Sequence, residues 1–141
     1  MFTFYLDENL HGETFASVLR AAGISIELCK DHHFSGVDDT IWIPEIAARG
    51  WIIVTGDVKT RHKSWERQVI IGSSAKMIHV RSGKNATHRM LAQNFVNTLP
   101  RIEAFLNKNP APCLATLTRP SKLEDYRAGK PGNINKQKLT M

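Results

Sequence analysis

The stretch "WIIVTGD", residues 51–57, places a carboxylate directly after an apolar run. Residues 51–55 are short, apolar and rich in β-branched and aromatic side chains, which is typical of a buried strand, and Gly56 ends the run. Asp57 then follows the end of this strand. Because a buried strand is a rigid support, the stretch predicts a strand that holds a functional carboxylate in place.

Strands and helices alternate on both sides of this stretch. We expect strands at residues 2–6, 24–28, 51–55, 76–80 and 113–118. We expect helices at 15–22 and 41–50, in the segment around Trp65 and Val69, and at 86–106, where Pro100 should kink or divide the helix. This order predicts an α/β fold with a mainly parallel sheet of four to five strands and helices on both faces.

The composition is that of an ordinary globular domain. The chain has 141 residues, 42% of them hydrophobic, which is enough for one domain with a substantial core. No apolar run approaches membrane-spanning length and no secretory signal is present, so we expect a cytoplasmic protein with no membrane association. Cys29 and Cys113 are expected to be reduced and buried.

The charge is basic and uneven. The formal net charge of +6 favours a polyanionic partner such as nucleic acid. Residues 119–141 carry six Lys or Arg against two acids, a net charge of +4, and few bulky apolar side chains. We therefore expect a core domain at residues 1–118 and a basic, flexible tail at 119–141.

Acidic residues follow several of the predicted strands. Asp7 comes directly after the first strand and Asp57 after the third, while Asp38 and Asp39 precede the helix that follows the second. The carboxyl ends of parallel strands share one edge of a sheet, where ligands bind. Since clustered carboxylates repel one another, a divalent cation such as Mg²⁺ would make the cluster tolerable and could activate water for attack on phosphorus.

Each acid also has a simpler interpretation. Asp38 is the better candidate for a helix N-cap and Asp39 for a metal ligand, whereas Gly56-Asp57 could form only a turn. Glu8 and Asn9 could begin a loop or cap a helix. Glu45 is either a fourth acid or a solvated residue, and Glu66 could be a surface charge. Thr55 is placed to orient the carboxylates through a hydrogen bond.

The histidines do not indicate a zinc site. His32 and His33 are adjacent, and the other four show no paired ligand spacing, so we expect all six on the surface or partly buried. The segment after Asp57 is basic, and its side chains could hold a phosphate backbone beside the acids. These candidate RNA-binding residues are Lys59, Arg61, Lys63 and Arg67. Trp65 is assigned to the core rather than to base stacking.

Three segments together resemble the PIN-like nucleases. They are "YLDENL" at residues 5–10, "VDDTIWIPEIAARGWIIVTGD" at 37–57, and Arg61 with Glu66 after them. The similarity covers roughly Phe2 to Val80, and the VapC-type toxins of bacterial toxin–antitoxin pairs are the nearest group. It implies a three-layer α/β/α ribonuclease that depends on Mg²⁺ or Mn²⁺ and is blocked by an antitoxin protein.

The resemblance also assigns roles to individual residues. Asp7, Asp39 and Asp57 match the acidic metal-binding and catalytic positions, with Asp38 an adjacent alternative. The classical domain has one more acidic position, for which Glu45 is the nearest candidate. The sequence around residues 86–141 lies outside the similarity.

Two other functions stay open at this point. A receiver-type signalling module also places a phosphoacceptor aspartate after its third strand, where Asp57 lies, although the expected late lysine is replaced by Arg81-Ser82. The basic tail would also suit a non-catalytic RNA-binding protein. The target RNA and the choice between monomer and homodimer are not decided by the sequence.

Overall fold

The computed structural model describes residues 2–10, 12–56, 64–81, 83 and 86–139, and of residues 64–66 the backbone alone. The strands are β1 (Thr3–Leu6), β2 (Ser25–Leu28), β3 (Ile52–Thr55), β4 (Lys76–Val80), β5 (Cys113–Thr118) and β6 (Asn133–Gln137). The helices are α1 (Glu13–Ala21), the short 3₁₀ helix η1 (Cys29–His32), α2 (Asp39–Ala48), α3 (Ser64–Ser73), α4 (His88–Lys108) and α5 (Leu123–Arg127). Within these residues, no helix has both the length and the apolar character needed to cross a membrane.

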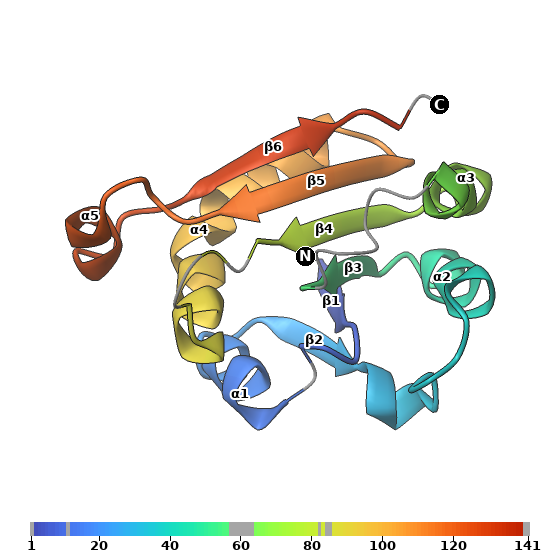
Figure 1. Ribbon diagram of the computed structural model, residues 1–141, viewed down its shortest axis with the longest axis horizontal. Coiled ribbons are helices and arrows are strands. Elements are labelled where there is room, and N and C mark those ends of the chain that lie inside the picture. Colours follow the sequence, from blue (N-terminus) through green and yellow to red (C-terminus); the bar gives the residue numbers. More distant parts are fainter. Residues whose placement is uncertain (1, 11, 57–63, 82, 84–85, 140–141) are drawn as a thin grey trace.

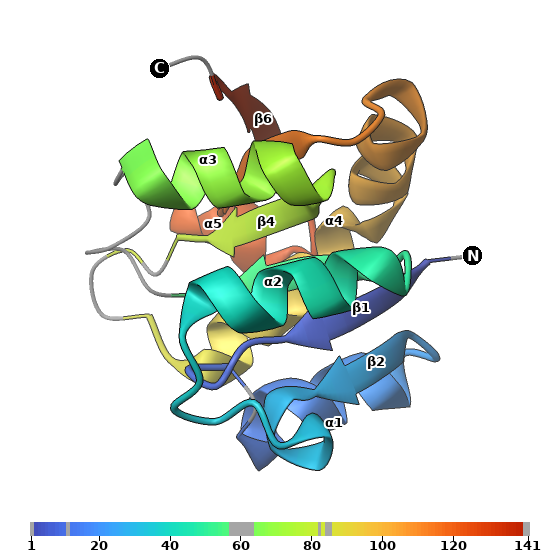
Figure 2. The same ribbon diagram turned by 90° about the vertical axis from the view of Figure 1, so that its right-hand side faces the viewer.

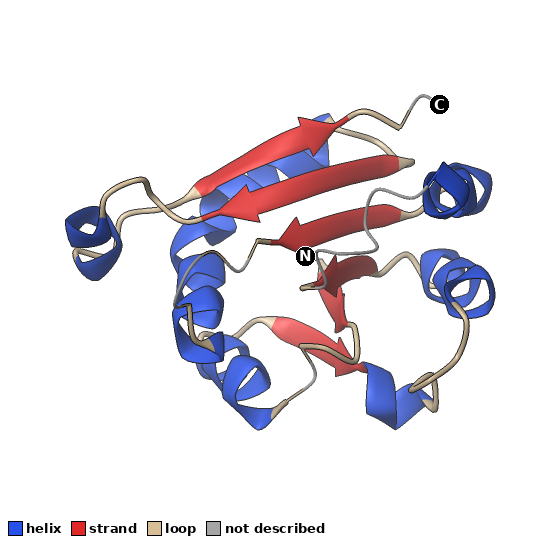
Figure 3. Ribbon diagram, viewed as in Figure 1, coloured by secondary structure: helices blue, strands red, loops and turns tan. Residues whose placement is uncertain are grey.

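One six-stranded sheet forms the centre of the molecule. Its strand order is β2-β1-β3-β4-β5-β6, and every neighbouring pair is parallel except β5 and β6. Helices α1 and α4 cover one face and α2 and α3 cover the other, as Figure 1 and, by element type, Figure 3 show. The predicted three-layer α/β/α class with a mainly parallel sheet is therefore confirmed, with one strand more than expected.

The two faces of the sheet carry separate cores because neighbouring residues of a strand point to opposite sides. Phe4 and Leu6 of β1 pack with α1 and α4, where Phe4 meets Phe95 edge to face at 5.2 Å between ring centroids. Tyr5, between them in sequence, packs with Trp42 of α2 on the other face. Cys29 and Cys113 are both free and buried, as predicted.

Two expectations about the second half of the chain need correction. Pro100 does not divide the last helix: α4 runs unbroken from His88 to Lys108. Residues 133–137, expected in a flexible tail, form β6 and pair with β5. The reason lies in the contacts of Gly132, whose N–H donates to Thr98 Oγ1 at 2.8 Å and whose carbonyl accepts from Arg101 at 2.8 Å. These bonds dock the start of β6 against α4.

Candidate active site at the β1–β3 edge

The strand order places a topological switch point where the sequence predicts its acids. From β1 the chain moves outward to β2 and then crosses back to β3 on the other side of β1, so the direction of winding changes there. In sheets of this kind, ligands bind beyond the carboxyl ends of the strands at such a switch point. Figure 2 shows that the carboxyl end of β1 and the start of α2 lie on the same side of the molecule.

Asp7 lies at this switch point and is 7% exposed. Its N–H donates to the Val54 carbonyl at 2.9 Å, which fixes the end of β1 against β3. Its Oδ1 accepts from the Glu8 N–H at 2.7 Å, and its Oδ2 accepts from Thr55 Oγ1 at 3.0 Å. The hydrogen bond expected of Thr55 is therefore present. These hydrogen bonds fix the orientation of the Asp7 carboxylate at the end of β1.

Glu8 and Asn9 hold the loop that follows Asp7. Glu8 Oε2 accepts from the Gly36 N–H at 3.0 Å, which ties the loop to the segment before α2. Asn9 Oδ1 accepts from the Gly56 N–H at 3.0 Å, which ties it to the end of β3. Neither residue caps α1, whose N-cap is Gly12. Through these hydrogen bonds, residues 7–9 connect the carboxyl end of β1 to the segment before α2 and to the end of β3.

Asp38 and Asp39 have different roles at the start of α2. Asp38 is the N-cap, as the sequence favoured, whereas Asp39 is half-buried and bonded to Trp42. Asp38 is exposed and caps α2, accepting from the Thr40 N–H at 2.9 Å and from Thr40 Oγ1 at 2.6 Å. The hydrogen bonds from the Thr40 hydroxyl and amide hold the pKa of Asp38 below its ordinary value. Asp39, half-buried, accepts from Trp42 Nε1 at 2.8 Å.

Trp42 connects Asp39 to the strand that carries Asp7. The Trp42 ring is 2% exposed and packs on Tyr5 with 5.5 Å between ring centroids, and burial raises the pKa of the Tyr5 phenol. Asp39 lies one helical turn before Trp42, and Asp7 lies two residues beyond Tyr5 on the same face of β1. Asp39 and Asp7 therefore both lie on the side of the sheet that α2 covers, near the carboxyl end of β1.

A row of buried polar residues crosses the sheet beside Asp7. The register pairs Thr55 with His79 and His79 with Thr116, so these three side chains share one face. Asn135, which pairs with Thr116 on the edge strand β6, is exposed. Thr55 is fully buried, His79 is 4% exposed and Thr116 is 9% exposed. The expectation that every histidine is on the surface or partly buried is wrong for His79. The signal in the sequence was a polar residue near the carboxyl end of an otherwise apolar strand.

The other predicted site residues that the structure describes do not belong to this row. Glu45 is exposed on α2, among residues that do not face the core. Arg67 is half-buried on α3. Asp57, Lys59, Arg61 and Lys63 lie outside the described residues, as do the side chains of Trp65 and Glu66. Within the described part of the chain, no three His, Cys, Asp or Glu side chains gather closely enough to hold a metal ion.

The structure is thus a three-layer α/β protein with a buried carboxylate, Asp7, at the switch point between β1 and β3. A family model described as a PIN-like domain matches residues 2–82, more than half of the chain. The chain therefore belongs to the PIN-like domain family, whose members are generally nucleases that act on nucleic acid. No curated protein and no solved structure matches the chain.

Proposed function

We propose that this protein is a metal-dependent endoribonuclease in which Asp7, Asp39 and Asp57 hold Mg²⁺ or Mn²⁺. The observation that carries the proposal is the buried Asp7 carboxylate at the switch point, held by Thr55 and the Glu8 amide. PIN-like domains are generally nucleases, and PIN nucleases generally use divalent metal ions. We infer that Asp39 and Asp57 lie beside the buried Asp7, where mutual repulsion of the carboxylates would be costly without a cation.

The donor set suits a hard cation. Mg²⁺ and Mn²⁺ prefer carboxylate and water oxygens, and the carboxylate of Asp7 offers such oxygens at a fixed place. When bound, the ion would activate a water molecule and neutralise charge on the scissile phosphate. In the hydrolysis, water supplies the oxygen of the new P–O bond, the bond to the leaving ribose oxygen breaks, and a proton reaches that oxygen.

The surrounding residues would orient the acids and hold the substrate. Thr55 would fix the Asp7 carboxylate, and the indole N–H of Trp42 would fix Asp39. We assign phosphate contacts to Lys59, Arg61, Lys63 and Arg67 on the basis of their charge and their position after β3. Asp38 serves the helix cap, and Glu45 is retained only as a secondary candidate acid.

We further propose that the protein acts in the cytoplasm as the toxin of a type II toxin–antitoxin pair, with the antitoxin covering this edge. The support is the similarity to VapC-type toxins in the segments around Asp7 and Asp57. Co-expression with the product of an adjacent gene, followed by co-purification and loss of nuclease activity, tests this role. Size-exclusion chromatography with light scattering tests the homodimer.

The nuclease itself is tested by cleavage of labelled single-stranded RNA with Mg²⁺ or Mn²⁺. We expect Asp7→Asn and Asp57→Asn to abolish cleavage while the circular dichroism spectrum is retained. Asp125→Asn is the matched control, since Asp125 makes only a surface ion pair with Lys130 at 3.3 Å and should keep full activity. Cleavage that persists in both site variants would refute the proposal.

Two results would favour the alternative functions. Salt-sensitive RNA binding without turnover in the wild type would favour the non-catalytic alternative, and phosphorylation of Asp57 by acetyl phosphate would favour the receiver.

A further inference from the structure

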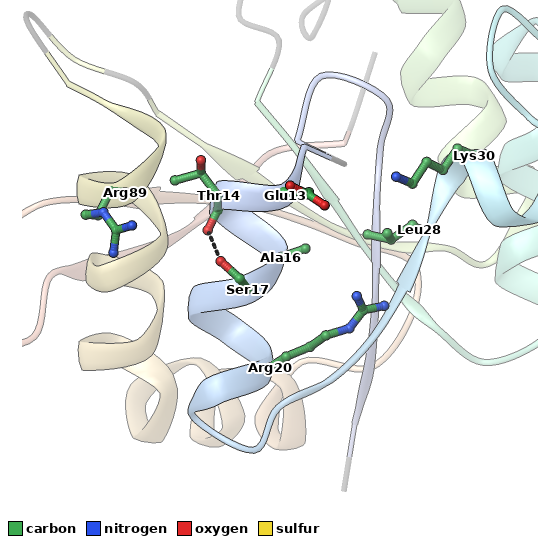
Figure 4. Close-up of a pocket in the computed structure, with 8 residues that line it drawn as sticks. All are labelled: Glu13, Thr14, Ala16, Ser17, Arg20, Leu28, Lys30 and Arg89. Carbon is green, nitrogen blue, oxygen red and sulfur yellow. Dashed lines mark hydrogen bonds between the residues drawn. The ribbon is translucent and has the colours of Figure 1, made fainter.

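A second candidate site lies outside the acidic edge, in a pocket between α1, α4 and the end of β2. The pocket has a volume of about 580 Å³. Three cationic side chains line it: Arg20 of α1, Lys30 of η1 and Arg89 of α4. In the view of Figure 4, Arg89 lies on one side of α1, whereas the Arg20 and Lys30 side chains lie on its other side. The charge is thus spread along the pocket and is not concentrated at one point.

These cations are not used by the fold. All three residues are exposed, and none of them takes part in an ion pair or side-chain hydrogen bond within the described part of the chain. Glu13 is the one acid among the described lining residues, which together carry a net charge of +2. These exposed cations outnumber the acid beside them, so the described lining is electrostatically suited to an anionic ligand.

The pocket borders the carboxyl end of β2, on the face of the sheet that α1 and α4 cover. Leu28, which lines it, is the last residue of β2, and Lys30 follows that carboxyl end directly. Helix α1 begins after the loop that follows β1, and β1 and β2 are neighbouring parallel strands. A polynucleotide bound at Asp7, on the α2 face, would therefore have to pass the carboxyl end of the edge strand β2 to reach this pocket.

We propose that the pocket formed around Arg20, Lys30 and Arg89 binds backbone phosphates of the single-stranded RNA on one side of the cleavage site. The inference rests on the proposed ribonuclease function and names the path of its substrate. Among the described lining residues there is no aromatic side chain on which a base could stack, so we assign the contacts to phosphates, with little sequence preference. Cations on both sides of α1 suit successive phosphates better than a single free phosphate.

The test measures RNA binding separately from cleavage. Fluorescence anisotropy of a labelled single-stranded RNA is recorded with the wild-type chain in EDTA, over a series of salt concentrations. For the triple variant Arg20→Ala, Lys30→Ala and Arg89→Ala we expect at least about a 10-fold weaker affinity at low salt. The slope of log K against log salt should fall by about 2, since each single-strand phosphate contact contributes about 0.7. Glu13→Gln, which removes the opposing charge, should strengthen binding.

A matched control separates local contacts from net charge. The variant Lys108→Ala, Lys136→Ala and Lys138→Ala removes the same charge from exposed positions elsewhere and should change affinity by less than about 3-fold. Equal losses in the two triple variants, or no loss in the first, would overturn the inference. Complete competition by millimolar inorganic phosphate would overturn it as well, by indicating a site for free phosphate.

If the wild type does not cleave RNA but the pocket variant still loses binding, the ribonuclease proposal fails and the pocket stands. If cleavage is established but the pocket variant binds normally, the pocket alone fails.

Discussion

Thr55 Oγ1 donates a 3.0 Å hydrogen bond to Asp7 Oδ2 between two buried side chains that lie 48 residues apart in the sequence. The bond joins the ends of β1 and β3, the two neighbouring strands between which the winding changes direction. It gives the Asp7 carboxylate a fixed orientation before any ligand arrives. The proposed metal site depends on that orientation.

Thr55→Val should therefore affect stability and activity together. Valine keeps the shape of the side chain but removes the donor to Asp7, which we expect to cost about 1–3 kcal/mol in the free energy of unfolding. We expect cleavage to fall about 10- to 100-fold, as for other residues that orient a metal ligand. Urea denaturation and the RNA cleavage assay measure the two effects. Thr55→Ser retains the hydroxyl and should stay close to wild type in activity; equal activity in the serine and valine variants would argue against the orienting role.

Trp42→Phe tests the positioning of Asp39. Phenylalanine keeps an aromatic ring against Tyr5 but lacks the N–H that donates to Asp39 Oδ1. We expect a loss of about 1–2 kcal/mol in stability and about 10-fold in cleavage. Trp51→Phe makes the same chemical change at a ring that instead contacts His32 and Arg49, and should leave cleavage unchanged. A similar activity loss in both variants would point to a general packing effect.

Asp38 should make the stability of α2 depend on pH in the acid range. Hydrogen bonds from Thr40 hold the folded-state pKa of Asp38 below its unfolded value. Its contribution is therefore fully present above the unfolded pKa and is lost as the pH falls through the folded pKa. An asparagine side chain also caps a helix but does not ionise, so the melting temperature of Asp38→Asn should lie below that of wild type near neutral pH. The gap should close in strongly acidic buffer, and a gap that widens on acidification would contradict this explanation.

Gly132→Ala should loosen the attachment of β6. A Cβ at this buried position would collide with the Thr118 carbonyl oxygen and with the side-chain amide of Asn94. We expect a loss of about 1–3 kcal/mol in stability, measured by urea denaturation. Gly72→Ala is the control: a Cβ there meets nothing, the residue lies inside α3, and the substitution should be neutral or stabilising by up to about 1 kcal/mol. Wild-type stability in Gly132→Ala would show that β6 is not docked through this glycine.

The fold was predictable where the apolar pattern is strong. The runs at β1, β3 and β4 are almost wholly buried, and Gly23 and Gly50 end α1 and α2 with φ angles of 79° and 75°, as expected of helix stops. The strand β6 was missed because "NINKQ" is polar and has a single apolar residue, Ile134. One apolar side chain is enough to pack a strand at the edge of this sheet against the core. Its docking depends on Gly132 and on α4, contacts that no local pattern reveals.

The candidate site was predictable in outline. Asp7 and the role of Thr55 follow from the position of strand ends, and the capping role of Asp38 follows from its place before α2. His79 was missed because its importance comes from the register of β4 between Thr55 and Thr116, which the sequence does not specify. The bond from Trp42 to Asp39 depends on how α2 packs on β1, and this too is a tertiary property.

The most direct measurement of the metal site is anomalous diffraction from a crystal soaked in Mn²⁺ at a concentration that supports RNA cleavage. We predict one strong peak beyond the carboxyl ends of β1 and β3, within about 2–2.5 Å of carboxylate oxygens of Asp7 and Asp57 and lost in Asp7→Asn. No peak at this edge, or a peak bound only by residues elsewhere, would contradict the account.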